Sequence, residues 1–226
     1  MDVIENKKDA IESRKLSPDE RRSHILNIAL QAFLRDGYSG TSMSRIAAQL
    51  GGSKTTLYNY FTSKKELFVA VADREAEKLF DQIFVISEGA GDFPTMIVEL
   101  VRRFLTALLS DYIIASERMI VAESGRFPEV GHAAYEIAVR RGVDGLTACF
   151  ERAIRSGQMR NADPKLAAEQ FLDLTAGNLH KQRLWNVVTD IDTGAIAREA
   201  EAIARTFLAA FGNDELSRAA RLTSDR

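Results

Sequence analysis

The 226-residue sequence predicts an all-α protein with about nine helices. Apolar residues recur at three- and four-residue intervals along most of the chain, and no convincing stretch alternates in the manner of a strand. The four prolines and 14 glycines fall mostly between these periodic segments, where they would begin or end helices. A hydrophobic fraction of 46% is ordinary for a globular protein, so a substantial core is expected.

The first helix is predicted to begin after Ser17. Residues 1–16 mix acidic and basic side chains without an apolar segment, so they are expected to form a disordered tail rather than a signal peptide. Ser17 and Glu20 have the spacing of a capping box, with a proline at the first helical position. Gly37 is expected to end the helix. The buried stripe of this helix is predicted to contain Ile25, Ile28, Ala29, Ala32 and Phe33.

Two short helices joined by a glycine turn are predicted next, between Thr41 and Phe61. Thr41 or Ser42 would cap the first of them, and Ser53 would cap the second. Gly51-Gly52 would make the turn, because glycine readily adopts a left-handed backbone conformation. This arrangement is typical of a DNA-reading helix-turn-helix.

The charge pattern of this stretch supports the same interpretation. No Asp or Glu occurs from Gly37 to Lys65, although 27% of the whole chain is charged. A surface that meets phosphates has to avoid acidic groups. The second short helix would direct its free amides, its positive dipole end and a lysine at DNA. The residues expected to contact DNA are Thr41, Ser42, Arg45, Ser53, Lys54, Thr55, Thr56, Tyr58, Asn59, Tyr60 and Lys64.

Each of these residues also has a plainer interpretation. Tyr60 is equally compatible with packing in the core, and Arg45 with a solvated surface charge. Leu57 and Phe61 are expected to anchor the helix to the core of the domain.

The Lys and Arg residues outnumber the acidic ones by three in residues 1–68 (11 against 8), whereas the acidic residues outnumber them by five in residues 69–226 (24 against 19).

Long helices are predicted for the remainder of the chain. Ser63 and Glu66 resemble a second capping box, which would open a helix reaching about Ile86. The expected domains are a helix-turn-helix domain at 17–62, a helical ligand-binding and dimerisation domain at 63–212, and a polar, frayed tail at 213–226. Further helices are predicted at 93–110, 112–123, 127–156, 163–185 and 193–211.

Several classes of function are disfavoured. Cys149 is the one cysteine and sits among apolar residues, so a buried structural thiol is expected. The three histidines do not have the spacing of a metal site, and neither a phosphate loop nor a nucleophile elbow occurs, so no cofactor and no enzymatic activity are expected. No segment approaches the ~20 apolar residues of a membrane span. A cytoplasmic protein without membrane contact is therefore predicted.

The region around the glycine turn resembles the TetR family of bacterial transcription regulators. Gly52 stands where the family usually has an aliphatic residue, and Thr55 replaces a frequent glycine or small residue. Segments 118–129, 168–171 and 177–180 are similar to the C-terminal domain of an AefR-like or AcrR-like subgroup. The matching pieces of the N-terminal region are Ile25–Phe33, Gly37-Tyr38, Thr41-Ser42, Ile46-Ala47, Ser53-Lys54, Thr56-Leu57-Tyr58, Tyr60-Phe61 and Ser63-Lys64.

The resemblance implies a homodimer that binds a palindromic operator on double-stranded DNA. The helices at 163–185 and 193–211 would pair with those of a second copy as a four-helix bundle. Their apolar residues would serve either this contact or the core of the protomer itself. These residues are Leu166, Phe171, Leu172, Leu174, Ile196, Ile203, Phe207 and Leu208.

The resemblance also implies a small-molecule effector that releases a repressor from DNA. An apolar or aromatic effector is expected, because such pockets are mostly hydrophobic. The same residues are compatible with an activator, or with an adaptor whose DNA-binding head is weakened. Each candidate lining residue also has a plainer interpretation, the apolar ones as ordinary core. The candidates are Phe84, Phe104, Leu108, Met119, His132, Tyr135, Phe150, Phe171, Asn178 and Trp185.

Overall fold

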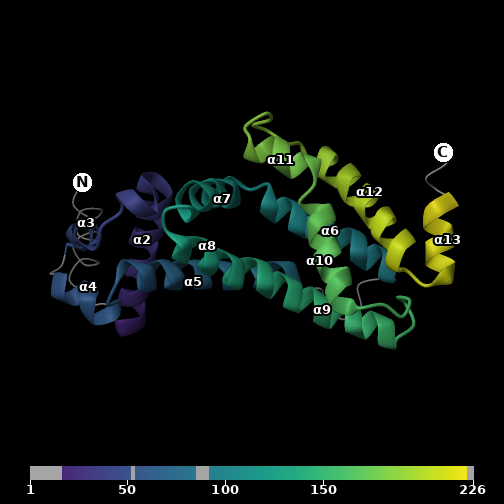
Figure 1. Ribbon diagram of the computed structural model, residues 1–226, viewed down its shortest axis with the longest axis horizontal. Helices are drawn as coiled ribbons and strands as arrows, with labels where there is room; N and C mark the ends of the chain where they lie inside the picture. The colour runs from purple at the N-terminus through teal and green to yellow at the C-terminus, as the bar shows by residue number, and fades with distance from the viewer. Residues whose placement is uncertain (1–16, 52–53, 85–91, 223–226) are drawn as a thin grey trace, which may run out of the picture. The chain divides into compact units, whose positions relative to one another are not determined.

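The computed structural model describes residues 17–51, 54–84 and 92–222, and these are helical apart from short connections (Figure 1). No strand occurs in these ranges, where the extended pairing is limited to an isolated bridge between Met159 and Gly212. The predicted all-α class is confirmed. The chain divides into two compact units, Met1–Val71 and Ala72–Arg226.

The first unit contains α2 (Pro18–Gly40), α3 (Met43–Gln49), α4 (Lys54–Tyr60) and the first turns of α5 (Lys64–Phe84). The capping box at the start of α2 is confirmed. The Ser17 amide donates to the Glu20 carboxylate at 2.8 Å, and the Glu20 amide donates to the Ser17 hydroxyl at 3.2 Å. Gly37 interrupts the helical backbone with φ 73°, as its predicted role as a stop requires.

The core of the first unit gathers apolar residues from all four helices. Leu57 is 0% exposed and Phe61 is 2% exposed, which confirms that they anchor α4. Phe33, Tyr38 and Phe68 form a cluster of aromatic rings whose centroids lie 5.3 to 5.9 Å apart. Such ring pairs stabilise a core beyond the area that they bury.

The start of α5 differs in one detail from the predicted capping box. Ser63 accepts a hydrogen bond from the Glu66 amide at 3.1 Å, as predicted. The Glu66 carboxylate, however, accepts from the amide and hydroxyl of Thr62, at 2.7 and 2.6 Å. These two bonds lower the pKa of Glu66. The end predicted for this helix, Ile86, lies outside the described residues.

The second unit continues α5 and adds the remaining helices. Its core forms where α6, α9, α10 and α12 pack together (Figure 1). Cys149 is buried there, as predicted, and burial raises the pKa of its thiol. The helices are α6 (Phe93–Leu108), α7 (Asp111–Ser124), α8 (Pro128–Ala134), the π-helical turn η1 (Tyr135–Val139), α9 (Arg140–Arg155), α10 (Pro164–Thr175), α11 (Asn178–Leu184), α12 (Thr193–Phe211) and α13 (Asp214–Leu222).

The prediction of one helix over 163–185 is wrong. Helix α10 ends at Thr175, and Gly177 leaves the helical region with φ −77° and ψ −143° before α11 begins. The predicted helix at 127–156 is helical along its length, but η1 divides it. These divisions raise the number of helices above the predicted nine or so.

The expectation of a frayed C-terminal tail is wrong for residues 214–222, which form a helix, whereas residues 223–226 lie outside the described residues. Helix α13 follows Gly212, and the Asn213 side chain caps it by accepting from the Leu216 amide at 3.0 Å. The Ser217 hydroxyl donates to the Gly212 carbonyl at 2.9 Å and secures the turn. Among the described residues, no helix is both long enough and apolar enough to span a membrane.

Candidate nucleic-acid interface

Helix α4 is fixed on one side and open on the other. Leu57 and Phe61 hold it to the core, whereas Lys54, Thr55, Tyr58 and Asn59 are exposed. Thr56 and Tyr60 are half-buried, so they lie at the margin between the two sides. A short helix with an anchored apolar side and a polar open side has the form that a recognition helix needs.

The start of α3 is ordered by Ser42. Its side chain accepts from the Arg45 amide at 3.3 Å, so Ser42 rather than Thr41 is the capping residue. Ser42 itself is exposed, and its place at the first turn suits a phosphate contact.

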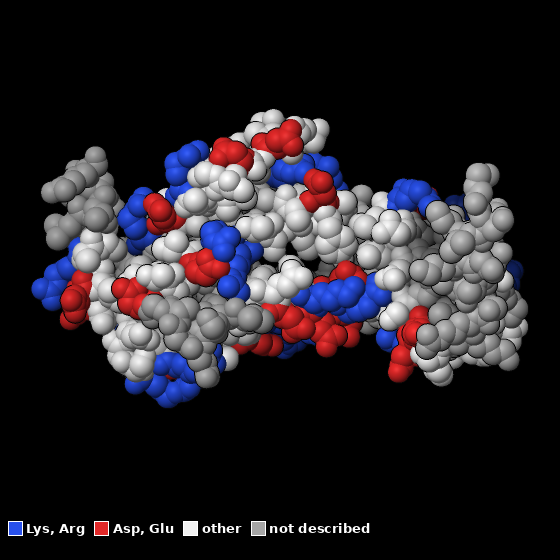
Figure 2. Space-filling view, turned by 180° about the vertical axis from the view of Figure 1, so that it is seen from behind, with Lys and Arg blue, Asp and Glu red and all other residues white. Residues whose placement is uncertain are grey.

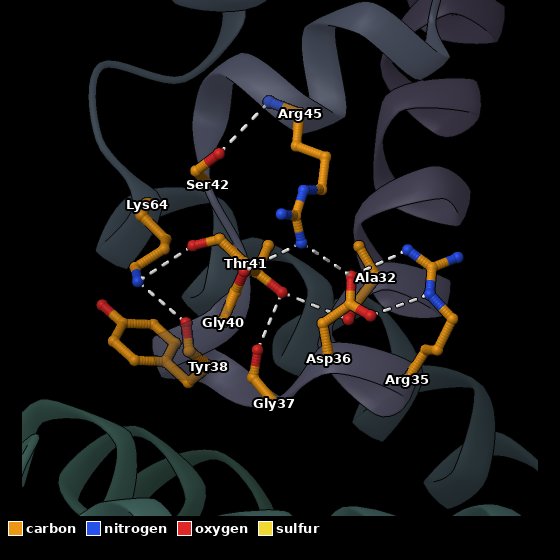
Figure 3. Close-up of polar contacts among 10 residues, drawn as sticks. All are labelled: Ala32, Arg35, Asp36, Gly37, Tyr38, Gly40, Thr41, Ser42, Arg45 and Lys64. Atoms are coloured by element: carbon orange, nitrogen blue, oxygen red, sulfur yellow. Dashed lines mark hydrogen bonds and ion pairs between the residues drawn. The ribbon is translucent and has the colours of Figure 1, made fainter.

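Thr41 differs from the sequence-based expectation. It is 2% exposed, and its hydroxyl donates toward the carbonyl oxygens of Ala32 (3.1 Å) and Gly37 (2.7 Å), as Figure 3 shows. These carbonyls belong to the end of α2, where the helix leaves backbone acceptors unpaired. The Thr41 side chain therefore joins α2 to α3 and does not face outward.

Lys64 also points inward rather than to the surface. Its ammonium donates to the carbonyl oxygens of Tyr38 (2.8 Å) and Thr41 (3.1 Å) and lies 4.3 Å from the centroid of the Tyr38 ring (Figure 3). The first of these pairs is separated by 26 residues, so sequence reasoning could not detect it. The geometry makes Lys64 a link between α5 and the α2–α3 connection.

Arg45 remains accessible. Its side chain is 60% exposed, and its guanidinium lies 3.7 Å from Asp36 and 3.4 Å from the Gly40 carbonyl. Asp36, the acidic residue directly before the acid-free stretch, also forms an ion pair with Arg35. The hydrogen bond from Arg35 is the largest cause of the lowered pKa of Asp36. The one acid at this border is thus neutralised by two arginines.

The turn between α3 and α4 is only partly described. Gly51 adopts φ 63°, which confirms the predicted left-handed glycine. Residues Gly52 and Ser53 lie outside the described residues. The part of Gly52 in the turn and the cap that Ser53 would give α4 therefore stay predictions. On the face drawn in Figure 2, basic and acidic groups lie in small mixed clusters among the described residues.

Four of the candidate ligand residues, all phenylalanines, are linked by ring contacts, in which the Phe84 and Phe104 centroids lie 5.9 Å apart. Phe104, Phe150 and Phe171 lie in the core, where the Phe171 ring contacts the other two at centroid distances of 5.8 Å. The plainer interpretation as core therefore holds for these three. Half-buried positions are taken by Phe84, Leu108 and Met119, and exposed positions by His132, Tyr135, Asn178 and Trp185.

A polar contact joins α7 and α11, and its partners could not be identified from the sequence. The imidazole of His180, a residue that is 7% exposed, lies 2.7 Å from the Glu117 carboxylate. Arg118 donates to the carbonyls of Arg183 (2.9 Å) and Leu184 (2.8 Å) at the end of α11. The signal available in the sequence was a histidine on an otherwise apolar segment, but its partner is 63 residues away.

An all-helical chain with an anchored, acid-free α4 after a glycine turn defines a helix-turn-helix, DNA-binding transcriptional regulator. Two family models match the chain: bacterial regulatory proteins of the tetR family at residues 25–71, and the C-terminal domain of AefR-like transcriptional repressors at residues 95–213. The chain belongs to the TetR family. The predicted resemblance, including its AefR-like subgroup, is confirmed.

Similar proteins include both activators and repressors. The chain is 42% identical over 65 residues to the transcriptional activator FasR of Mycolicibacterium smegmatis, covering 29% of this chain and 30% of that protein. It is 38% identical over 66 residues to the transcriptional repressor TetR of Mycobacteroides abscessus, covering 29% and 35%. The matched part thus spans about a third of these relatives.

Two solved structures resemble nearly the whole chain. A regulator of the TetR family from Mesorhizobium loti superposes with a TM-score of 0.77 at 27% identity, covering 88% of this chain and 100% of that one. The flavonoid-responsive regulator FrrA superposes with a TM-score of 0.75 at 33% identity, covering 86% and 98%.

Proposed function

We propose that the protein is a ligand-responsive transcriptional repressor that binds a palindromic operator as a homodimer. The observation that carries the proposal is α4, which Leu57 and Phe61 hold from one side while Lys54, Thr55 and Asn59 face solvent. Two such helices in a dimer would enter successive major grooves, ~34 Å apart. The exposed Ser42 and Arg45 would contact the backbone beside each groove.

Helix α5 offers a route from effector to DNA. It begins in the first unit and ends in the second, because the division between them falls after Val71. An effector that binds one conformer of the second unit more tightly would shift the population of that conformer, by no more than its differential affinity. We infer that α5 transmits this shift to the spacing of the two DNA-binding heads.

An aromatic effector is the class that the comparisons favour. The family model for the C-terminal domain describes AefR-like repressors, and the similar regulator FrrA is described as flavonoid-responsive. The second unit is rich in aromatic and aliphatic side chains, as a site for such a ligand requires.

Binding to DNA from the chain's own upstream region tests the proposal. The purified protein is titrated against this duplex and against a scrambled duplex of equal length. Selective binding that weakens with salt is expected. Equal, weak binding to both duplexes, followed by no enrichment in a selection from genomic fragments, would refute the DNA-binding role and favour the adaptor.

The effector is tested separately on the bound complex. Flavonoids and simpler aromatic compounds are added to the protein–operator complex, and release is followed by fluorescence anisotropy. Release by an aromatic compound but not by an aliphatic compound of equal size is expected. Release by the aliphatic compound alone would contradict the proposed effector class.

An activator is the second candidate. The DNA-binding region is 42% identical to that of a protein named as an activator, and the same α4 contacts would serve either role. A reporter gene behind the bound promoter separates the two, because deletion of the regulator raises expression under a repressor and lowers it under an activator.

A further inference from the structure

The turn after α11 presents two large apolar side chains on an ordered backbone. The Val187 amide donates to the Gln182 carbonyl at 2.8 Å, and the Asn186 amide donates to the Arg183 carbonyl at 3.1 Å. Asn186 has φ 61°, the one positive value among non-glycine residues in the described ranges. This pair of bonds around a left-handed residue is the Schellman motif, which satisfies the last carbonyls of a helix.

The motif lacks its usual apolar contact. The residue in the position of Val187 normally packs against the residue in the position of Gln182, but glutamine is polar. Val187 is instead 68% exposed, and Trp185, the one tryptophan of the chain, is 72% exposed. Exposed tryptophan is unusual because the indole is among the largest apolar groups and is enriched at the centres of protein interfaces.

Three polar contacts hold this turn in place on α7. The Arg118 guanidinium donates to two carbonyls at the end of α11, Arg183 forms an ion pair with Asp111, and His180 lies against Glu117. The side chains of Trp185 and Val187 are thus presented on a backbone that is already ordered. Preorganisation of this kind reduces the entropy lost on association.

Helices α10 and α12, which are expected to form the dimer, expose few large apolar side chains, and Leu172, Leu174 and Ile196 on them are half-buried. Phe171 and Phe207 are 0% exposed, and Ile203 and Leu208 are 7% exposed, so they close the core of the protomer. Leu166 on α10 is the one large apolar residue left open on α10 and α12, at 47%. The exposed positions on α12 are small or charged: Thr193, Ala197, Arg198, Glu201, Arg205, Thr206 and Ala210.

The charges around the turn are self-complementary. Lys181 before the turn and Asp190 after it are exposed, whereas Arg183 pairs with Asp111 and Asp192 caps α12, so the segment 181–192 presents one charge of each sign outside those contacts. A two-fold axis places the same surface of both copies in contact, with the two chains running in opposite directions. The basic end of one segment would then meet the acidic end of the other.

We propose that Trp185 and Val187 form an apolar anchor that a second copy of the chain covers in the dimer. This inference rests on the proposed homodimer and adds a contact outside α10 and α12. The anchor adds an exposed indole, a larger apolar group than the Leu166 side chain that α10 exposes. Both residues lie in the connection between α11 and α12, so this connection would become part of the dimer interface.

The single tryptophan makes the inference directly measurable. Quenching of its fluorescence by acrylamide is measured on the full chain, while sedimentation equilibrium gives the fraction of dimer in the same samples. The expected quenching constant for the dimer is several-fold lower than that of N-acetyltryptophanamide. A dimer as readily quenched as this free analogue would overturn the inference and leave the proposed homodimer intact. A chain that stays monomeric at all concentrations would refute both.

Two matched substitutions locate the contact. Val187→Asp is expected to raise the dimer dissociation constant on the order of tenfold or more, because it places a charge in a desolvated contact. Val139→Asp, at another exposed valine (44%), is expected to change it by less than about twofold. Circular dichroism verifies that both variants fold. Equal effects of the two substitutions would overturn the inference.

Discussion

Single side chains in the first unit divide into those that face solvent and those that hold the unit together. Lys64 belongs to the second group, because its ammonium donates to the Tyr38 and Thr41 carbonyls and lies over the Tyr38 ring. Hydrogen bonds from a charged donor are stronger than neutral ones, and the ring adds a cation–π contact. The neighbouring Lys65 is exposed and makes none of the contacts just described for Lys64.

Lys64→Met is therefore expected to lower the free energy of unfolding of the DNA-binding unit by about 1–3 kcal/mol. Urea denaturation, followed by circular dichroism, measures the effect, and Lys65→Met is the matched control with an expected change below about 0.5 kcal/mol. If Lys64 is only a phosphate contact, the substitution will weaken DNA binding without lowering stability, contrary to this account.

The individual helices show which local signals are sufficient to predict structure. The Ser17–Glu20 capping box and the glycines at 37 and 51 were predictable, because a cap or a left-handed turn depends on neighbouring residues alone. The break at Gly177 was not, because glycine inside a helix also allows close packing. Helix α13 was missed because a polar, amphipathic segment needs a surface to pack on, and α12 provides it only in the folded chain.

Gly51 tests the turn between α3 and α4. A Cβ atom there would meet no atom within 4 Å, so the φ of 63° alone disfavours other residues. Gly51→Ala is expected to lower the unfolding free energy by about 1–2 kcal/mol, the cost of a left-handed conformation. Gly51→Asn should cost less, because asparagine tolerates this region. Equal unfolding midpoints for the two variants would show that the turn does not require the left-handed residue.

The ion pairs of Glu99 within α6 predict a pH dependence. Hydrogen bonds from Arg102, and then from Arg103, lower the pKa of Glu99 from 4.5 to about 2. Arg103 also donates to the Gln82 carbonyl at 3.0 Å, which ties α6 to the end of α5. Because the folded pKa is the lower one, the stabilisation is complete above pH 4.5 and is lost as the pH falls toward 2.

Glu99→Gln is expected to reduce stability at neutral pH by less than about 1 kcal/mol, since the pair is partly exposed. The same contribution is lost on acidification, so the wild-type unfolding free energy should fall more steeply than that of the variant between pH 4.5 and about 2. Unfolding curves across this range measure the difference. An equal fall of the unfolding free energy with pH in the wild type and the variant would contradict this prediction. Glu201→Gln on α12 controls for the loss of one negative charge.

At the scale of the whole molecule, two compact units share one continuous helix. The sequence predicted the class of fold, the DNA-binding region and the family, because these depend on local caps, periodicity and an acid-free stretch. The ligand residues stay a prediction. Phe104 and Phe150 each pack against Phe171, and no local pattern distinguishes a core phenylalanine from one that lines a cavity.

We propose that the exposed side of α4 binds operator DNA. The most direct test is the salt dependence of operator binding for the wild type, for Lys54→Ala and for Arg155→Ala, which removes a charge from the second unit. We predict that Lys54→Ala reduces the slope of log K against log salt by about two, one for each protomer, and leaves unfolding unchanged. Arg155→Ala should match the wild type. A Lys54→Ala protein with the affinity and slope of the wild type would contradict the assignment of α4 as the DNA-binding helix.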